Sequence, residues 1–130
     1  MCIRDRFRLG VDAETAISLS RQIKASPHLE LEGIFSHFAT ADGDIAFANQ
    51  QLNNFLEIIK NLEAASITIP IKHIASTAGC LNLPTSQLDG CRIGIGLYGL
   101  ANTEMIDAFT TEGDQKISLR PVMTLSLIHI

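Results

Sequence analysis

An arginine followed by alternating glycines is the part of this sequence whose residue types point most directly to chemistry. It lies in the run CRIGIGLYGL, residues 91–100. If this run is a strand, Arg92, Gly94 and Gly96 share one face, and the isoleucines share the other face, which can pack against helices. A guanidinium beside backbone N–H groups that no side chain covers suits an anion or a flat, anionic cofactor. A buried barrel strand with small residues where space is tight would give the same pattern, so this run alone leaves both interpretations open.

Polar residues that could join the arginine follow two other strand-like segments. His37 comes directly after the first of them, and Thr77 comes after the second, at the start of a short helix that Pro84 ends. Because the carboxyl ends of parallel strands meet at one edge, we expect these side chains to lie near Arg92. A threonine at a helix start beside glycine amides is typical of a phosphate site, although it could equally be only a helix cap. His37 taken alone could equally be a structural histidine.

The elements that must position these residues alternate between helix and strand. Apolar residues recur at helical spacing in two segments, and apolar runs bounded by turn residues predict strands between them. The predicted order is a helix over residues 12–25, a strand over 29–36, a helix over 45–64, a strand over 69–75, a short helix from 76, and the arginine–glycine strand. Residues 101–118 are polar and irregular, which predicts a linker. This order predicts an α/β fold with a parallel sheet, and the polar strand ends favour part of a (β/α)8 barrel, which needs roughly 200 or more residues when complete.

Composition excludes several classes of protein. The chain has 130 residues, of which 46% are hydrophobic and 18% charged, and its net charge is −4, so we expect a globular protein with no nucleic-acid partner. No apolar run is long enough to span a membrane, and we expect no membrane partner. Cys2, Cys80 and Cys91 form no CxxC pair. This argues against a zinc site or a disulfide framework, predicts no metal, and favours the reducing cytoplasm.

Three ordered motifs resemble bacterial alanine racemase. They are GIFSHFATAD (residues 33–42), HIASTA (73–78) and RIGIGLYGL (92–100). FRLG (7–10) is similar to a further family segment, and LRPVM (119–123) is similar to the entry to the family's second, β-rich domain. The resemblance covers about residues 7–125. It implies that residues 7–117 are the C-terminal part of a (β/α)8 barrel that binds pyridoxal 5'-phosphate, and that residues 118–130 begin the β domain.

The resemblance implies an isomerase that interconverts L- and D-alanine for peptidoglycan synthesis and works as a homodimer. Arg92 matches the arginine that donates to the pyridine nitrogen of the cofactor, where a fixed cation disfavours protonation of that nitrogen. Thr77, Gly94 and Ile95 match positions that hydrogen-bond the cofactor phosphate. His37 matches a histidine packed by the cofactor ring. A further matched arginine, Arg8, lies near the phenolic oxygen and the substrate carboxylate in the family, although it could also be a solvated surface cation. His73 is interpreted as a buttress.

The sequence departs from the family in its proton-transferring groups. Racemisation needs one base that removes the α-proton and another that returns it. None of the four lysines matches the motif of the lysine that binds the cofactor, and the sole tyrosine, Tyr98, is not the second base. Residues 1–6 and 126–130 also depart from the resemblance, and we interpret them as foreign or disordered termini. We therefore expect a fragment of alanine racemase that is inactive alone and binds the cofactor weakly or not at all. The alternatives are a pyridoxal-phosphate homeostasis protein on the same barrel and a fragment without catalytic function.

Overall fold

The computed structural model describes residues 10–101 and 119–122. Their elements are helix α1 (Ala13–Ala25), strand β1 (Gly33–Phe35), helix α2 (Ile45–Ala64), strand β2 (Ile71–His73), helix α3 (Thr77–Asn82), and the 3₁₀ helices η1 (Pro84–Ser86) and η2 (Ile95–Tyr98). None of the helices in these two ranges is both long enough and apolar enough to cross a membrane. The alternation of helix and strand that the sequence predicts is therefore confirmed as far as β2 and α3.

Both long helices begin at aspartates that cap them. The Asp12 carboxylate accepts a hydrogen bond from the Thr15 N–H at 2.8 Å, and the Asp44 carboxylate accepts one from the Phe47 N–H at 2.9 Å. Each carboxylate satisfies an amide that has no partner within its helix. These local signals are why the predicted helices over residues 12–25 and 45–64 are confirmed almost to the residue.

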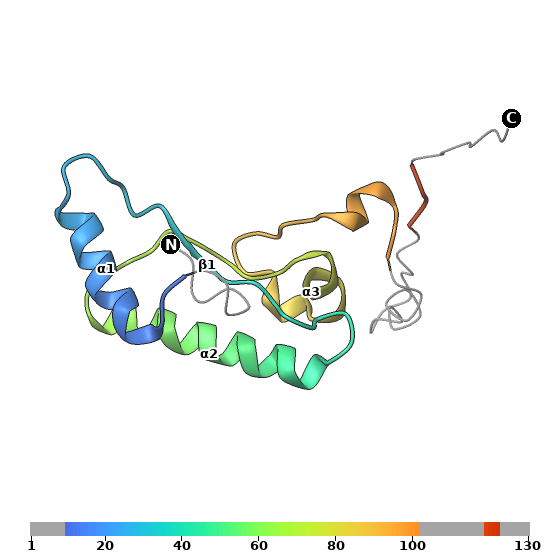
Figure 1. Ribbon diagram of the computed structural model, residues 1–130, viewed down its shortest axis with the longest axis horizontal. Coiled ribbons are helices and arrows are strands. Elements are labelled where there is room, and N and C mark those ends of the chain that lie inside the picture. The colour runs from blue at the N-terminus through green and yellow to red at the C-terminus, as the bar shows by residue number, and fades with distance from the viewer. Residues whose placement is uncertain (1–9, 102–118, 123–130) are drawn as a thin grey trace, which may run out of the picture.

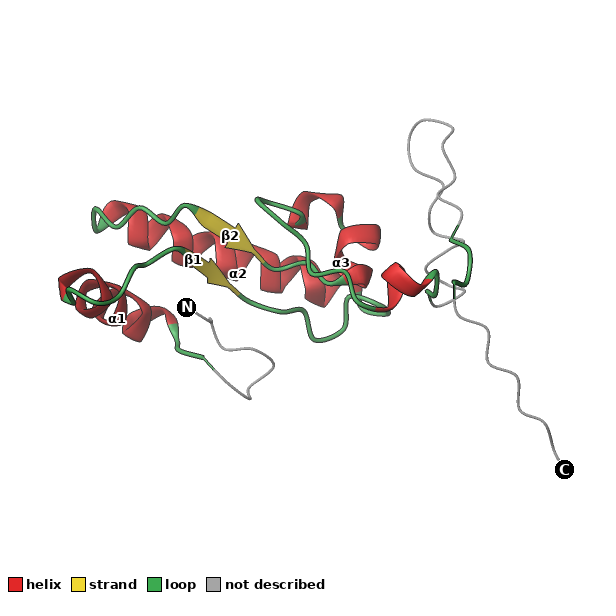
Figure 2. Cartoon of the chain, turned by 90° about the horizontal axis from the view of Figure 1, so that it is seen from above, coloured by secondary structure: helices red, strands yellow, loops and turns green. Residues whose placement is uncertain are grey.

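The two strands pair in parallel, as Figure 2 shows by their arrows, with Gly33 opposite Ile71 and Phe35 opposite His73. Both strands are shorter than predicted, although the N–H of Ser36 still donates to the His73 carbonyl oxygen at 3.2 Å. A parallel bridge between Ser76 and Arg92 then places a third segment beside the end of β2. The carboxyl ends of three successive segments are thus gathered at one edge.

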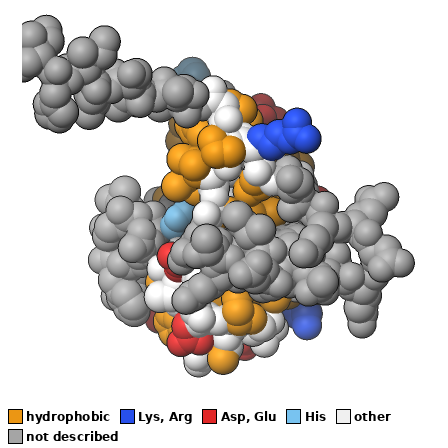
Figure 3. All heavy atoms as spheres, turned by 90° about the vertical axis from the view of Figure 1, so that its right-hand side faces the viewer, with side chains coloured by type: hydrophobic (Ala, Val, Ile, Leu, Met, Phe, Trp, Pro, Cys, Tyr) orange, Lys and Arg blue, Asp and Glu red, His pale blue; other side chains and the backbone are white. Residues whose placement is uncertain are grey.

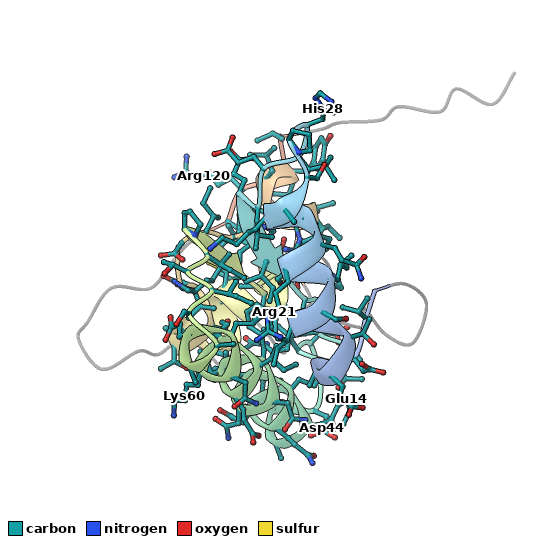
Figure 4. All side chains as sticks on the ribbon, turned by 90° about the vertical axis from the view of Figure 1, so that its left-hand side faces the viewer. Glu14, Arg21, His28, Asp44, Lys60 and Arg120 are labelled. Atoms are coloured by element: carbon teal, nitrogen blue, oxygen red, sulfur yellow. The ribbon has the colours of Figure 1, made fainter. Side chains whose placement is uncertain are left out.

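The core lies between the strand pair and helix α2, which runs along one face of the strands in Figure 1. α1 packs against α2. Charged side chains such as Glu14 and Lys60 point away from this core in Figure 4. The buried apolar residues are Ala16, Ile34, Phe38, Ala41, Ala48, Leu52, Phe55, Ile59, Leu62, Ile67, Ile69, Ile74, Ala75 and Leu83.

The predicted strand over residues 91–100 is wrong. Only Arg92 makes a strand-like bridge, and the chain then turns at Gly94 into helix η2, with the Leu97 N–H donating to the Gly94 carbonyl oxygen at 3.0 Å. The glycines permit this turn, and Gly99 ends η2 in the left-handed conformation at φ +72°. The isoleucine face does not pack against helices either, because Ile95 is 56% exposed.

The segment that contains η2 leaves large hydrophobic side chains on the surface. Figure 3 views the end of the molecule where this segment lies and shows hydrophobic side chains there. Beyond it, only residues 119–122 are described, and the Val122 N–H donates to the Tyr98 carbonyl oxygen at 3.1 Å. Most of the predicted linker and of the predicted β domain lies outside the described residues, so both stay predictions.

Candidate functional site

A cavity of about 440 Å³ lies at the edge where the three segments end. Five of the six predicted contact residues line it, namely His37, Thr77, Arg92, Gly94 and Ile95. The sixth, Arg8, lies outside the described residues. The other lining residues are Phe38, Ala39, Ala41, Asp42, Ser76 and Ala78. A second cavity, of about 420 Å³, lies between α1, α2 and the end of β1 and contains none of the predicted contact residues.

The guanidinium of Arg92 joins the ends of both strands. Its Nη1 donates to Nδ1 of His73, and its Nη2 donates to Nδ1 of His37 at 3.0 Å. Nη2 also donates to the carbonyl oxygen of Ser36 at 2.5 Å. Hydrogen bonds of a charged donor are stronger than those of neutral groups, and several in different directions fix the orientation of the planar group.

An aromatic stack supports the same guanidinium from one side. Phe35 and His73 are paired across β1 and β2, and their rings stack with centroids 5.3 Å apart and an interplanar angle of 5°. The guanidinium carbon of Arg92 lies 5.2 Å from the Phe35 ring centroid, within range of a cation–π interaction. The register of the two strands therefore determines where the cation lies.

Both histidines that contact Arg92 must accept through Nδ1, because arginine has only donors. Each ring is therefore neutral and carries its proton on Nε2. Burial, and then the positive charge of Arg92, lower the pKa of His73 below its usual value. From the sequence, His73 is expected only to support the site, and its contact with Arg92 gives that expectation a physical basis.

The Thr77 hydroxyl organises the glycine segment. Its Oγ1 accepts hydrogen bonds from the N–H of Gly94 at 3.0 Å and from the N–H of Gly96 at 3.3 Å. A Cβ on Gly96 would lie 2.6 Å from Cγ2 of Thr77, so only glycine permits this approach. A Cβ on Gly94 would meet no atom within 4 Å, so that position leaves the cavity open. Because Oγ1 uses its lone pairs on the two amides, the hydroxyl hydrogen is available for an acceptor in the cavity.

Two amide side chains hold the loop between His37 and α2, and sequence reasoning missed both. Oε1 of Gln51 accepts from the Ala39 N–H at 3.0 Å, and Nδ2 of Asn82 donates to the Ala41 carbonyl oxygen at 2.8 Å. Both side chains are half-buried. A polar residue at the border of an apolar helix face is the only signal that could have identified Gln51.

The chain matches the model of the family described as "Alanine racemase, N-terminal domain" over residues 4–102. This match covers well over half of the chain. The chain belongs to this family. Among curated relatives, alanine racemase of Clostridium tetani is 38% identical over 107 residues, which are 80% of this chain and 26% of the relative. Alanine racemase of Desulfovibrio desulfuricans is 38% identical over 119 residues, 91% of this chain and 30% of the relative.

Solved alanine racemase structures share the fold of the chain. The Clostridium difficile 630 enzyme in complex with cycloserine matches with a TM-score of 0.78 and 30% identity, over 92% of this chain and 32% of that chain. The Bacillus anthracis enzyme with bound L-Ala-P matches with a TM-score of 0.75 and 29% identity, over 88% of this chain and 29% of that chain. The chain thus spans about a quarter to a third of the length of these relatives, and it corresponds to part of their α/β barrel domain.

We expect Thr77→Val to release the glycine segment of this alanine racemase family member. The substitution leaves the amides of Gly94 and Gly96 without their acceptor, which costs about 1–3 kcal/mol locally. Amide hydrogen exchange measured by NMR should then be faster at these two glycines by about tenfold or more. Thr77→Ser keeps the hydroxyl and is the matched control. Equal exchange rates in the valine and serine variants would contradict this role of the hydroxyl.

The lowered pKa of His73 predicts a dependence of stability on pH. The folded chain keeps His73 neutral, whereas the unfolded chain binds a proton once the pH falls below about 6.5. The free energy of unfolding should therefore fall as the pH is lowered from about 7.5 to about 5.5, which urea titrations at each pH would measure.

The control for this prediction is a histidine away from the site. We expect His73→Gln to flatten the pH dependence and His28→Gln to leave it unchanged, because His28 is exposed at the surface, as Figure 4 shows. The same slope in both variants would show that other groups cause the dependence.

Proposed function

We propose that this chain is the part of an alanine racemase that holds the phosphate and the pyridine ring of pyridoxal 5'-phosphate while L- and D-alanine are interconverted. The arrangement that supports this proposal is Arg92, held by His37 and His73, beside the glycine segment that Thr77 organises. It places a fixed cation and several anion-binding groups around one cavity. The cavity has the size of a cofactor site.

The residues present fit the phosphate of this cofactor. The Thr77 hydroxyl can donate to a phosphate oxygen while its own oxygen accepts from the two glycine amides. Ile95 begins η2, so no carbonyl of that helix can accept from its N–H, and this amide can donate to the anion. Gly94 leaves the cavity open where a side chain would fill it.

Arg92 would contact the pyridine nitrogen. When bound, the cofactor withdraws electrons from the amino-acid Cα and makes its proton removable. The Arg92 cation disfavours protonation of the ring nitrogen and so moderates this withdrawal, which favours return of the proton over side reactions. Its contacts with the two histidines and with Ser36 hold the guanidinium in that position. His37 would pack beside the ring, and Arg8 would bind the phenolic oxygen and the substrate carboxylate.

The two bases would come from elsewhere in the assembly. Among the described residues that line the cavity there is neither a lysine nor a tyrosine. In the proposed homodimer, one base lies on an earlier strand of the barrel and the other on the partner subunit. We further propose a cytoplasmic enzyme that supplies D-alanine for peptidoglycan. No observation favours the alternative of a pyridoxal-phosphate homeostasis protein.

A chimera tests this function directly. The stretch of the Clostridium tetani relative that aligns with this chain is replaced by the aligned residues of this chain. If the proposal is right, the chimera binds pyridoxal phosphate, seen by its absorbance, and interconverts L- and D-alanine, seen by chiral chromatography. A folded chimera that binds no cofactor, or that binds it without racemising alanine, would contradict the proposal.

A further inference from the structure

The loop between β1 and α2 forms one wall of the cavity that contains Arg92. The loop residues that line this cavity are His37, Phe38, Ala39, Ala41 and Asp42. The hydrogen bonds that the loop backbone makes with itself lie at its far end, where the N–H groups of Gly43 and Asp44 donate to the carbonyl oxygen of Thr40 at 3.1 and 2.8 Å. The part of the loop that carries His37 therefore depends on contacts with other elements.

Helix α2 supplies such a contact close to the histidine. The N–H of Ala39, two residues after His37, donates to Oε1 of Gln51 at 3.0 Å. Gln51 directly precedes Leu52, which is 4% exposed, so packing of α2 against the core keeps the acceptor in a fixed place. A partly buried N–H that loses its acceptor destabilises the folded chain, so we expect the loop to keep this contact.

Phe38, between the histidine and the residue that Gln51 holds, is fixed on a different helix. It is 3% exposed, and a Cβ on Gly79 of α3 would lie 2.7 Å from its ring carbons, so the ring lies directly on the α3 backbone. His37 thus lies between the end of β1 and two residues that α3 and α2 hold. In this position its Nδ1 accepts from Nη2 of Arg92 at 3.0 Å.

We propose that Gln51 is a positioning residue, which keeps His37 in contact with Arg92 by holding the Ala39 N–H. Gln51 does not line the cavity of Arg92, so it acts only through these residues. Loss of its acceptor lets the loop move and takes one hydrogen-bond partner from the guanidinium, whose orientation depends on bonds in several directions. The consequence for racemisation rests on the function proposed above.

Hydrogen exchange measured by NMR on the full chain tests the contact without any cofactor or substrate. Gln51→Met and Gln51→Ala remove the acceptor, whereas Gln51→Glu keeps a side-chain oxygen in the same place. We expect the Ala39 N–H to exchange about tenfold or more faster in the first two variants, and the Nη hydrogens of Arg92 about threefold or more faster. Both rates should stay unchanged in Gln51→Glu.

Gln50→Met is the matched control for these variants. Gln50 is the same type of residue, directly precedes Gln51 in α2 and is exposed, so its substitution should change neither rate. Faster exchange at Ala39 without any change at Arg92 would overturn the inference, because Gln51 would then support only the loop. Unchanged exchange at Ala39 in both Gln51→Met and Gln51→Ala would overturn it as well.

A double-mutant cycle in the chimera separates positioning from a general loss of stability. Gln51→Met should lower kcat about tenfold and leave KM and the cofactor absorbance unchanged, because the cation is held less firmly but is still present. In a chimera that already carries Arg92→Lys, the same substitution should change kcat by less than about twofold, because the geometry that it supports is already lost.

The two arms of the test distinguish the inference from the proposed function. An equal loss of kcat with and without Arg92→Lys would overturn the inference, because Gln51 would then act independently of Arg92. If the unsubstituted chimera does not racemise alanine, the proposed function fails. The exchange rates of the full chain then still decide whether Gln51 positions Arg92.

Discussion

Replacing Phe55 with alanine is expected to lower the free energy of unfolding by about 3–5 kcal/mol. Phe55 is 2% exposed and lies on the face of α2 that is buried beneath the strands. The substitution removes the largest fully buried side chain of the described residues and leaves a cavity that the neighbouring side chains fill only in part. A loss of this size approaches the total stability of a small domain.

Phe47→Ala on the same helix is the matched control for this prediction. Its side chain is 39% exposed, and its contribution to the Asp44 cap comes from the backbone N–H, which alanine keeps. Urea titrations followed by far-ultraviolet circular dichroism should therefore show a loss of about 0.5 kcal/mol or less for this variant. Similar losses in the two variants would mean that α2 does not use this face to form the core.

The helices could be predicted from the sequence because their signals are local. In α2 the apolar residues recur at helical spacing, which predicts the buried face of the helix. Asp44 directly precedes the first turn, which predicts where the helix begins. The same holds for α1 with Asp12. Each signal lies within a few residues of the structure that it specifies.

The approximate positions of the strands could be predicted from the sequence, but their first and last residues could not. A strand extends only as far as its partner strand pairs with it, and the partner lies elsewhere in the sequence. Leu29 lies within the predicted first strand but is 61% exposed and precedes the paired residues. Residues 91–100 show even more clearly that contacts with distant residues decide the structure. Their alternation fits a strand, but the Thr77 hydroxyl takes the amides of Gly94 and Gly96 and the chain turns into η2 instead. This competition depends on a residue many positions away in the sequence.

The sequence predicted which residues form the candidate site better than it predicted the contacts between them. His37 and Thr77 were predicted to lie near Arg92 because each of them follows a strand, and the three residues line one cavity. The contact of Gln51 with the Ala39 N–H and that of Asn82 with the Ala41 carbonyl oxygen arise only when α2 and α3 have packed. The roles assigned to the site residues stay predictions until a cofactor-bound form is tested.

Arg92→Lys is expected to reduce kcat of the chimera by about 10²-fold or more while the cofactor stays bound. Lysine keeps the positive charge but ends in a single nitrogen, so it cannot reach His73 through one nitrogen while a second reaches His37 and Ser36. The cation would then no longer be fixed beside the ring nitrogen. The phosphate contacts proposed for Thr77 and the glycine segment do not involve this side chain.

Arg21→Lys is the control, because Arg21 is an exposed residue of α1 that does not line the cavity, and we expect it to leave kcat unchanged. Racemisation rates and cofactor absorbance are measured on both variants. An unchanged kcat in Arg92→Lys would show that charge alone suffices and that the fixed planar geometry has no catalytic role. A joint loss of kcat and cofactor would instead show that Arg92 holds the cofactor rather than tuning it. Only a loss of kcat with the cofactor retained supports the role proposed for its contacts with the two histidines.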